Sequence, residues 1–373
     1  MEGKIQKILM TTDTVGGVWN YSVQLCRVLN DYGIEVHLAA MGSWPSEDQQ
    51  KEIDQLKKTI LYKSDYKLEW MQDPWNDVEQ AGKWLNSIYH TIQPQIIHFN
   101  NYAHLGKEWT GPTLTVFHSC VRTWWQAVKG TAAPETWDRY SKAVADSLNS
   151  SDVVVAPTRA ILKEAVNTHG VTSETKVIYN GIELDPSEKT EKEDLILCIG
   201  RVWDEAKNLK SLSETAKNLP WPVYVVGNNV DPNTGKAVEI ENVNFLGELS
   251  QQEVQDWMQR ASIFVSPTKY EPFGLAILEA ASAECTLVLS KLETLEELWT
   301  GAAHFFNSED KIEAEEKILQ LIQNEELRKE LAAKAEKRSK DFSAEKMGSE
   351  YISLYRDSLP KTNINDKQLS HSL

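Results

Sequence analysis

Short apolar runs alternate with amphipathic helical patterns along most of this chain, and this alternation constrains the fold more than any other feature. In the first half, the apolar runs that we expect to form strands are residues 7–10, 35–40, 95–99, 114–117, 153–156 and 176–179. Repeated strand–helix units are typical of a parallel sheet that is covered by helices. The sequence therefore predicts an α/β protein.

The second half repeats this pattern after a polar segment. Residues 185–194 are charged and carry no apolar period, so we interpret them as a linker, with a solvated loop inside one domain as the alternative. The strands expected after it are residues 195–199, 223–226, 243–245, 263–265, 286–289 and 304–306.

The length of the chain indicates how these units are grouped. A chain of 373 residues exceeds the usual size of one hydrophobic core. We therefore expect two domains, one over residues 1–184 and one over residues 185–342. An amphipathic helix is expected at 343–359, and a disordered tail over 361–373.

Composition excludes several classes of partner. The net charge of −16 argues against nucleic acid and anionic membranes, since both need clustered Lys and Arg side chains. A small molecule or a neutral glycan is a more suitable partner for this acidic chain. There is no stretch of ~18 apolar residues and no apolar secretory signal, so we expect a cytoplasmic protein without stable membrane association. Four separated cysteines and the lack of an Asp-x-Asp or His/Cys cluster predict no disulfide, metal or cofactor.

The segment 267–280, PTKYEPFGLAILEA, carries the strongest functional signal. It follows an expected strand and puts Glu271 in a turn and Glu279 inside a helix that begins near Gly274. A helix N-terminus at a strand end offers free N–H groups to an anion such as a diphosphate. The carboxylates of Glu279 and Glu271 can accept hydrogen bonds from sugar hydroxyls, so the spacing suits a nucleotide-sugar.

This segment resembles the signature of the retaining glycosyltransferases of group 1, also called family 4, a class that includes glycogen and sucrose synthases. Two Glu residues separated by seven others surround a Phe-Gly-Leu turn. The resemblance implies the GT-B fold, which is two facing Rossmann-like domains with a cleft between them. It also implies that residues 343–360 cross back to complete the N-terminal domain, which binds the acceptor, while the C-terminal domain binds the donor.

The resemblance assigns roles to the signature residues. Glu271 is expected to contact the transferred sugar near the reacting carbon, and Glu279 to hold the ribose hydroxyls of the donor. Phe273, Gly274 and Leu275 form the turn between them and are expected to lie against the donor.

Other strand ends match the family in the same way. Gly16 and Gly17 resemble its first glycine-rich loop, which approaches the donor diphosphate. His118 follows a strand at the place of a family histidine that faces the transferred sugar, where an imidazole could donate to a sugar hydroxyl or orient the acceptor. Arg201 and Lys207 lie on one loop and resemble its phosphate clamp, although this loop is one residue longer than the commonest version.

The remaining candidates concern the base and the acceptor. Gly227 and Leu249 lie on segments that resemble the base-binding edges of the family, where recognition uses backbone groups. Trp124 and Trp125 come shortly after His118, and we expect them to form a wall of the acceptor site. One departure is at Glu284 and Cys285, where most relatives have a Gly followed by a Pro.

The implied reaction is metal-independent transfer of a hexose from a UDP, GDP or ADP sugar to a sugar, glycan or small-molecule acceptor, with retention of anomeric configuration. A nucleotide-sugar epimerase and a phosphorylase are alternatives within the same architecture. A catalytically silent nucleotide-sugar-binding partner is the alternative from another class.

Overall fold

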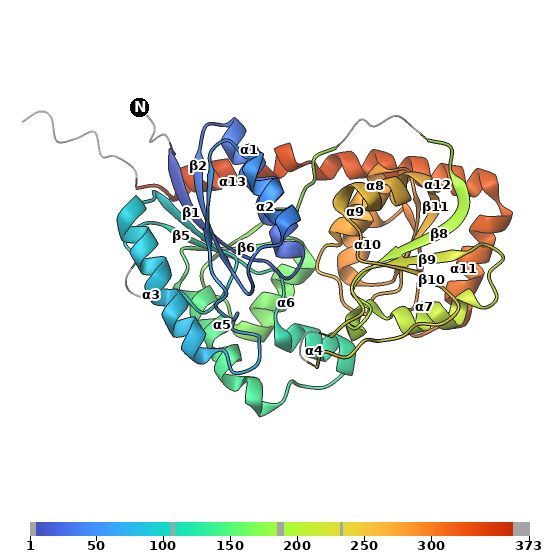
Figure 1. The fold of residues 1–373 in the computed structure, drawn as a ribbon, viewed down its shortest axis with the longest axis horizontal. Helices are drawn as coiled ribbons and strands as arrows, with labels where there is room; N and C mark the ends of the chain where they lie inside the picture. The colour runs from blue at the N-terminus through green and yellow to red at the C-terminus, as the bar shows by residue number, and fades with distance from the viewer. Residues whose placement is uncertain (1–4, 106–108, 185–189, 232–233, 361–373) are drawn as a thin grey trace, which may run out of the picture.

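The computed structural model describes residues 5–105, 109–184, 190–231 and 234–360, and these residues form two parallel sheets with helices on their faces (Figure 1). The first sheet has the order β3-β2-β1-β4-β5-β6-β7 and the second has the order β10-β9-β8-β11-β12-β13. All the strand pairs are parallel, as expected of repeated strand–helix units. The predicted α/β class and its two Rossmann-like halves are confirmed.

The first sheet consists of β1 (Lys7–Asp13), β2 (Glu35–Met41), β3 (Thr59–Lys63), β4 (Ile96–Phe99), β5 (Thr113–Val116), β6 (Val153–Ala156) and β7 (Glu174–Val177). Its helices are α1 (Gly17–Asp31), α2 (Glu47–Asp54), α3 (Trp75–Ile92), α4 (Val121–Lys129), α5 (Asp138–Ser150) and α6 (Arg159–His169). The edge strand β3 is absent from the sequence prediction. Its side chains are partly or fully exposed, so it lacks the apolar run that marks a buried strand.

The second sheet consists of β8 (Glu193–Ile199), β9 (Val223–Val226), β10 (Asn244–Gly247), β11 (Ala261–Ser266), β12 (Thr286–Ser290) and β13 (Ala303–Phe306). Its helices are α7 (Leu209–Ala216), α8 (Gln251–Arg260), α9 (Leu275–Ser282), α10 (Glu293–Trp299), α11 (Lys311–Gln323) and α12 (Glu325–Ser339). Residues 185–189 of the expected linker and the expected tail at 361–373 lie outside the described residues. The last two linker residues, Glu193 and Asp194, already belong to β8.

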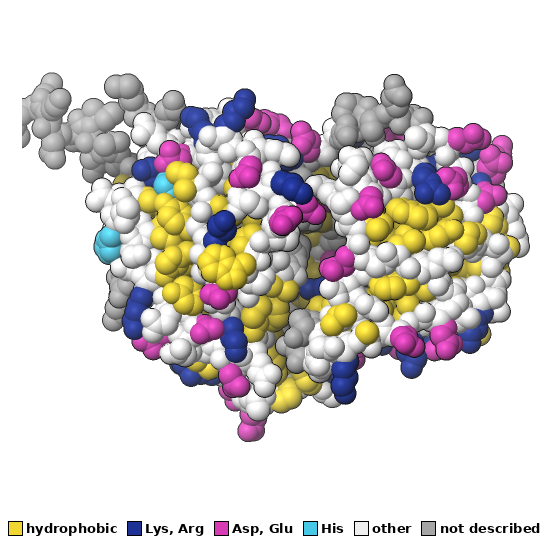
Figure 2. Space-filling view, in the orientation of Figure 1, with side chains coloured by type: hydrophobic (Ala, Val, Ile, Leu, Met, Phe, Trp, Pro, Cys, Tyr) yellow, Lys and Arg dark blue, Asp and Glu magenta, His cyan; other side chains and the backbone are white. Residues whose placement is uncertain are grey.

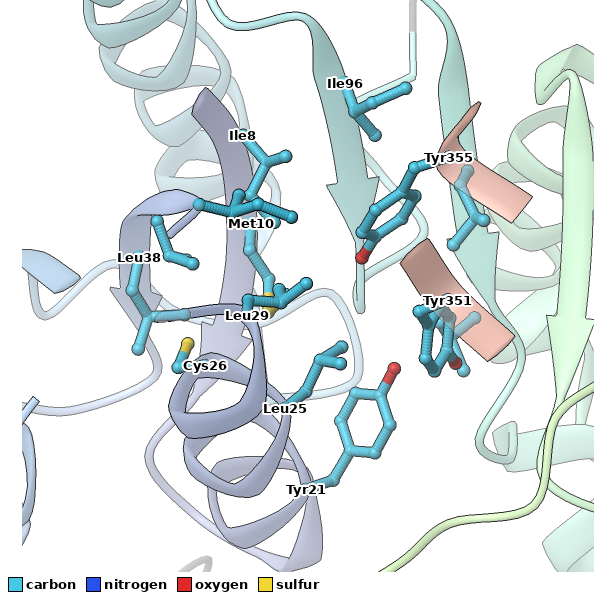
Figure 3. Packing of buried hydrophobic residues seen from close by; sticks show 14 of the residues in the cluster. Ile8, Met10, Tyr21, Leu25, Cys26, Leu29, Leu38, Ile96, Tyr351 and Tyr355 are labelled. Atoms are coloured by element: carbon cyan, nitrogen blue, oxygen red, sulfur yellow. The ribbon is translucent and has the colours of Figure 1, made fainter. Parts of the chain in front are cut away.

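The last helix, α13 (Ala344–Ser358), returns to the first sheet, as the family resemblance implied. The crossing begins where Ala344 N donates to Ile182 O at 2.8 Å. Tyr351 and Tyr355 then fill the space between α1 and the first sheet, beside Leu25 and Leu29 (Figure 3). Both tyrosines are completely buried, so α13 is part of the first hydrophobic core.

The turn from α9 to β12 is where the family resemblance led us to expect glycine. Glu284 adopts a left-handed φ of 60° there, a conformation that favours glycine. Lys192 supports the turn, because its partly buried amine donates to Ala283 O and Met258 O at 2.5 and 2.9 Å. The departure from the family pattern therefore changes a residue but keeps the backbone turn.

In the described part of the chain, no helix is both long enough and apolar enough to cross a bilayer.

We expect Gly348→Ala to lower the free energy of unfolding by about 1–3 kcal/mol, the usual cost of overpacking. A Cβ at Gly348 would lie 2.3 Å from Val28 Cγ1 on α1, and a β-branched side chain cannot easily move away. Urea unfolding measures the loss. Ser349→Ala on the exposed face of α13 is the control, and adding Val28→Ala to Gly348→Ala should recover part of the loss. Equal stability of the Gly348 and Ser349 variants would contradict close packing of α13 on α1.

Candidate active site

The carboxyl ends of the two sheets meet at the boundary between the domains. The loop after β1 carries Gly16, and the loop after β8 carries Arg201. A Cβ placed on Gly16 would lie 3.7 Å from Arg201 Nη1, which is ordinary contact distance. The surface is hollowed between the two lobes of the molecule (Figure 2). Open α/β sheets bind ligands at these strand ends, so we built the candidate site here.

Lys207 and Glu271 form an ion pair at the centre of the second half of the site. Lys207 Nζ lies 2.6 Å from Glu271 Oε2, and both side chains are mostly buried. The short 3-10 helix Glu205–Lys207 is held against the signature segment, because Ala206 O accepts from Lys269 N and Thr268 Oγ1, both at 2.7 Å. These bonds place Lys207 beside Glu271 despite the longer loop.

Two further contacts fix this pair. Glu271 O accepts a hydrogen bond from Thr294 Oγ1 of α10 at 2.7 Å. The stem of Lys207 packs on Gly200, where a Cβ would lie 3.2 Å from Lys207 Cγ. A bare backbone at Gly200 therefore leaves room for the extended lysine.

Arg201 is held at the edge of the site by Asp204. Its Nη2 lies 2.6 Å from Asp204 Oδ2, and Asp204 is almost completely buried while the arginine side chain is 41% exposed. On the other side of the domain boundary, burial raises the pKa of Asp13 and the charge of Arg201 opposes this shift. The guanidinium is thus positioned by one carboxylate but keeps an exposed face for a ligand.

Helix α9 begins directly after the signature turn. Gly274 has a φ of 86°, and a Cβ there would lie 2.7 Å from Ile277 Cδ1, so the turn requires glycine. No side chain in the described part of the chain caps this helix. Its first N–H groups and its dipole are therefore directed at the start of the helix, beside Glu271.

The remaining signature residues, Phe273, Leu275 and Glu279, differ in how deeply their side chains are buried. The Phe273 ring is buried in the second core, 5.8 Å from the ring of Phe342, so a donor contact by Phe273 would have to come from its backbone. Leu275 is partly buried between the first and second cores. Burial raises the pKa of Glu279 to about 7, so a ligand that uses its ionised form must compensate for lost hydration.

Gly227 and Leu249 lie at the far end of the second sheet. Gly227 has a φ of 144°, and a Cβ there would lie 2.1 Å from Gly200 O, so the loops after β8 and β9 touch through bare backbone. Gly227 N donates to Gly247 O at 2.9 Å. Leu249 is partly buried against the second core. Gly227 and Leu249 thus lie at the edge of the site where the sequence analysis expects the nucleotide base of the donor to bind.

His118 lies on the loop after β5 of the first domain. Its Nε2 lies 2.8 Å from Asn100 Oδ1, and its ring meets the edge of Tyr21 with the centroids 4.8 Å apart. Burial lowers the pKa of His118 to about 3, so the ring is neutral near pH 7. Since the amide oxygen of Asn100 can only accept, Nε2 must carry the proton. The Nε2–H of His118 is therefore bonded within the protein, and the expectation that His118 contacts the transferred sugar or orients the acceptor stays a prediction.

Trp124 and Trp125 lie on α4, next to the second domain. Trp124 Nε1 donates to Asp204 Oδ1 at 3.4 Å, and the neighbouring Lys129 pairs with Glu205 at 2.5 Å. Trp125 packs edge-on against Trp124, with the centroids 6.0 Å apart. Trp124 thus contributes to the contact between the domains, a use that its position in the sequence did not indicate.

Tyr270 joins the two halves of the site, and sequence reasoning missed it. It precedes Glu271, yet its ring is buried among first-domain residues, including Phe117. Its hydroxyl lies 2.7 Å from Thr123 Oγ1 and 3.3 Å from Glu164 Oε2. An aromatic residue directly before the signature glutamate is visible in the sequence, but its partners are more than 100 positions away.

A second contact joins the domains beside the signature turn. The carboxylate of Glu297 on α10 accepts hydrogen bonds from Arg159 N and Ala160 N, at 2.9 and 3.0 Å. These N–H groups open helix α6 of the first domain, so the negative charge faces the positive end of its dipole. Thr158 Oγ1 also lies 3.3 Å from Pro272 O.

The sequence analysis did not single out Asp13 or Asn100, although both lie at the carboxyl end of a strand. Asp13 ends β1, and Asn100 comes immediately after β4. The rule that ligands bind at the carboxyl ends of parallel strands would have identified both. Within the described residues, no group of three or more His, Cys, Asp or Glu side chains could hold a metal ion.

Two family models match the chain and together span its two halves. The model described as "Glycosyltransferase Family 4" matches residues 15–186, and the model described as "Glycosyl transferases group 1" matches residues 182–338. The chain belongs to the group 1 glycosyltransferases. The signature segment lies within the second match.

Curated relatives of this group 1 chain match it in part. An uncharacterized glycosyltransferase of Methanocaldococcus jannaschii is 28% identical over 181 residues, or 46% of this chain and 50% of the relative. A GDP-mannose:cellobiosyl-diphosphopolyprenol alpha-mannosyltransferase of Xanthomonas oryzae pv. oryzae is 27% identical over 220 residues, or 54% of this chain and 53% of the relative. The chain thus spans about half the length of the curated relatives it matches.

Solved structures resemble it over almost the whole chain. Sucrose-phosphate synthase from Thermosynechococcus elongatus superposes with a TM-score of 0.78 at 16% identity, covering 94% of this chain and 98% of that one. Anabaena HepE in complex with UDP-glucose superposes with a TM-score of 0.73 at 15% identity, covering 94% and 99%. At these identities the likeness establishes the GT-B fold of this group 1 member.

Glu69 is a buried carboxylate near the glycine loop of this group 1 protein. It is 3% exposed, and burial raises its pKa to about 7. Its Oε1 accepts from Tyr102 N at 3.1 Å, while no described residue bonds to its Oε2. The folded protein therefore holds this proton at a pH where the unfolded chain has released it.

From this we expect stability to depend on pH through Glu69. Between pH 5 and pH 8 the unfolded chain gains from ionising this carboxyl group while the folded state resists it, so wild-type stability falls. Glu69→Gln removes this titrating group, so its free energy of unfolding should not show this fall. Relative to wild type, the variant should gain up to about 3 kcal/mol of stability between pH 5 and pH 8. Urea unfolding at both pH values measures this difference, with the exposed Glu241→Gln as control. Parallel profiles for wild type and Glu69→Gln would contradict it.

Proposed function

We propose that this protein transfers a hexose from a nucleoside-diphosphate sugar to a hydroxyl group of an acceptor, with retention of anomeric configuration. The observation that carries the proposal is the Lys207–Glu271 pair at the start of α9, with Arg201 held by Asp204 on the same loop as Lys207. His118 lies on the loop after β5 of the other domain, and we assign it to the sugar side of the site. These groups supply cations for a diphosphate and polar atoms for a sugar.

The diphosphate would bind to Arg201, Lys207 and the start of α9. Without a ligand, Asp204 and Glu271 neutralise the two cations and hold them in place. A diphosphate can replace these carboxylates as the partner of the two cations. The guanidinium can donate two parallel N–H hydrogen bonds to phosphate oxygens. The same groups then stabilise the negative charge that builds on the leaving nucleotide.

The sugar would lie between Glu271 and His118. In the reaction the acceptor oxygen bonds to the anomeric carbon as the bond from that carbon to the diphosphate oxygen breaks. The acceptor's proton passes to the departing phosphate on the same face. Burial lowers the pKa of His118 to about 3, so its imidazole is a weak base, which supports the phosphate as the group that takes the acceptor's proton.

We propose that each of the two substrates binds to one of the two sheets and its helices. We assign the acceptor to residues 1–184 with 343–360, and the donor to residues 185–342. The packing of α13 into the first core supports this division. The four buried, free cysteines are consistent with a cytoplasmic location, which we propose for the reaction.

The names of relatives guide the choice of donor. Matches include an O-antigen chain mannosyltransferase of Salmonella typhimurium and the GDP-mannose enzyme of Xanthomonas oryzae pv. oryzae. The similarly folded Anabaena HepE was solved with UDP-glucose. GDP-mannose and UDP-glucose are therefore the first two donors to test.

The test is a thermal-shift panel with UDP, GDP and ADP, each alone and as its common hexose conjugates. A ligand at ~100 times its dissociation constant adds ~2.7 kcal/mol of apparent stability. We expect one nucleotide to give a selective shift that Lys207→Ala abolishes and that Lys210→Ala, an exposed change nearby on α7, preserves. No shift with any nucleotide would overturn the proposal, and binding without transfer to any acceptor would favour a silent partner. Turnover without an acceptor would indicate an epimerase, and a need for inorganic phosphate a phosphorylase.

We expect Glu271→Ala to lower turnover by at least ~10²-fold, the scale for losing one transition-state contact. The variant should still bind the bare nucleoside diphosphate, since Arg201, Lys207 and α9 remain. Initial rates with the selected donor measure the effect, and anomeric analysis of the product by NMR tests retention. Glu309→Ala, which removes an exposed carboxylate paired with Lys269, is the matched control. Wild-type turnover in Glu271→Ala would refute the role of this residue.

A further inference from the structure

We propose that Asn100 fixes His118 as the tautomer with its proton on Nε2, so that His118 Nδ1 accepts a hydrogen bond from a hydroxyl of the transferred hexose. The sugar contact rests on the proposed function, whereas the tautomer is a property of the free protein. Asn100 is then a positioning residue that determines which kind of hydrogen bond the site offers to the donor sugar.

The orientation of the Asn100 amide is set by its neighbours. Its Nδ2 donates to Thr11 O at 2.7 Å, and a backbone carbonyl oxygen can only accept. Asn100 N also donates to Thr11 Oγ1 at 2.9 Å, which fixes the backbone of the loop. The amide nitrogen is thus directed at β1, and the amide oxygen is directed at His118.

The amide oxygen then selects the tautomer of the histidine. Asn100 Oδ1 lies 2.8 Å from His118 Nε2 and has no hydrogen to donate, so the bond requires a proton on Nε2. A neutral imidazole carries one ring proton, which leaves a lone pair on Nδ1. Nδ1 makes no hydrogen bond to any residue that the structure describes, so its lone pair is available to accept one.

The ring cannot easily turn away from this arrangement. Tyr21 packs edge-on against it at an interplanar angle of 72°. The Tyr21 hydroxyl lies 3.3 Å from His98 Nε2, and His98 Nδ1 lies 2.6 Å from the hydroxyl of Tyr355 on α13. Tyr21, which packs on His118, is thus held in the first core through His98 and Tyr355.

Because Nδ1 carries a lone pair and no proton, a sugar hydroxyl that reaches it must donate the hydrogen bond.

The first test examines the tautomer in the free protein. Nitrogen-15 NMR of histidine-labelled protein distinguishes protonated from unprotonated ring nitrogens, and His118→Asn identifies the His118 signals by their loss. We expect an unprotonated Nδ1 and a protonated Nε2 in wild type. Asn100→Ala should yield a mixture of tautomers. A proton on Nδ1 in wild type, or an unchanged single tautomer in Asn100→Ala, would overturn the proposal.

The second test measures sugar recognition with GDP-mannose and UDP-glucose and with the monodeoxy analogues of each hexose. We expect wild type to disfavour one deoxy donor by ~10-fold or more in kcat/KM, because Nδ1 then lacks its donor. His118→Asn keeps an acceptor oxygen close to the place of Nδ1 and should retain part of this discrimination. His118→Gln and Asn100→Ala should lose it.

Binding of the bare nucleoside diphosphate separates the two proposals. GDP or UDP should shift the melting temperature of every variant as it does that of wild type, because His118 is expected to contact only the sugar. If neither nucleotide nor its sugar conjugate binds wild type, the proposed function fails and the sugar contact fails with it, while the tautomer is still decided by NMR. If the nucleotide shift persists but all the variants discriminate among deoxy donors like wild type, only the role of Asn100 and His118 is overturned.

Discussion

The burial of Tyr270 in the first domain is the contact on which the geometry of the site depends. The residue belongs to the second sheet's signature turn, yet its ring packs with Phe117 and its hydroxyl reaches Thr123. Because Glu271 follows it directly, the position of that carboxylate is tied to the loop that carries His118. Glu297 of α10 makes a second contact between the domains, because its carboxylate accepts hydrogen bonds from the first N–H groups of α6. Two domains held only by a linker would leave the two halves of the site free to separate.

Electrostatics explains how such a site exists without its ligand. Two cations on one loop repel each other, and this repulsion is less screened where one of them, Lys207, is mostly buried. Each cation here has its own carboxylate, with Asp204 beside Arg201 and Glu271 beside Lys207. These pairs keep the clamp formed and nearly neutral until an anion arrives. On the facing domain, His118 stays uncharged and therefore does not add to the repulsion.

The comparison of sequence with structure is most informative where a prediction was incomplete. The buried strands were predictable because each is a continuous apolar run, whereas β3 was missed because an edge strand does not need one. The sequence placed His118 after a strand but did not indicate its bond to Asn100, because Asn100 follows a different strand and is itself oriented by Thr11. The contact of Trp124 with Asp204 was equally hidden, because it joins residues from different domains.

By itself, the sequence determined the alternation of strands and helices and the family to which the chain belongs, and it indicated the loops to which we assign the chemistry. These features are local, because apolar periodicity, glycine positions and the spacing of Glu271 and Glu279 need no knowledge of distant contacts. Only the tertiary structure decided the pairing of Lys207 with Glu271, the tautomer of His118 and the anchoring of Tyr270. The physical reason is that a hydrogen bond or an ion pair depends on distances of a few ångströms between atoms. Folding alone brings such atoms together when they are tens to hundreds of residues apart.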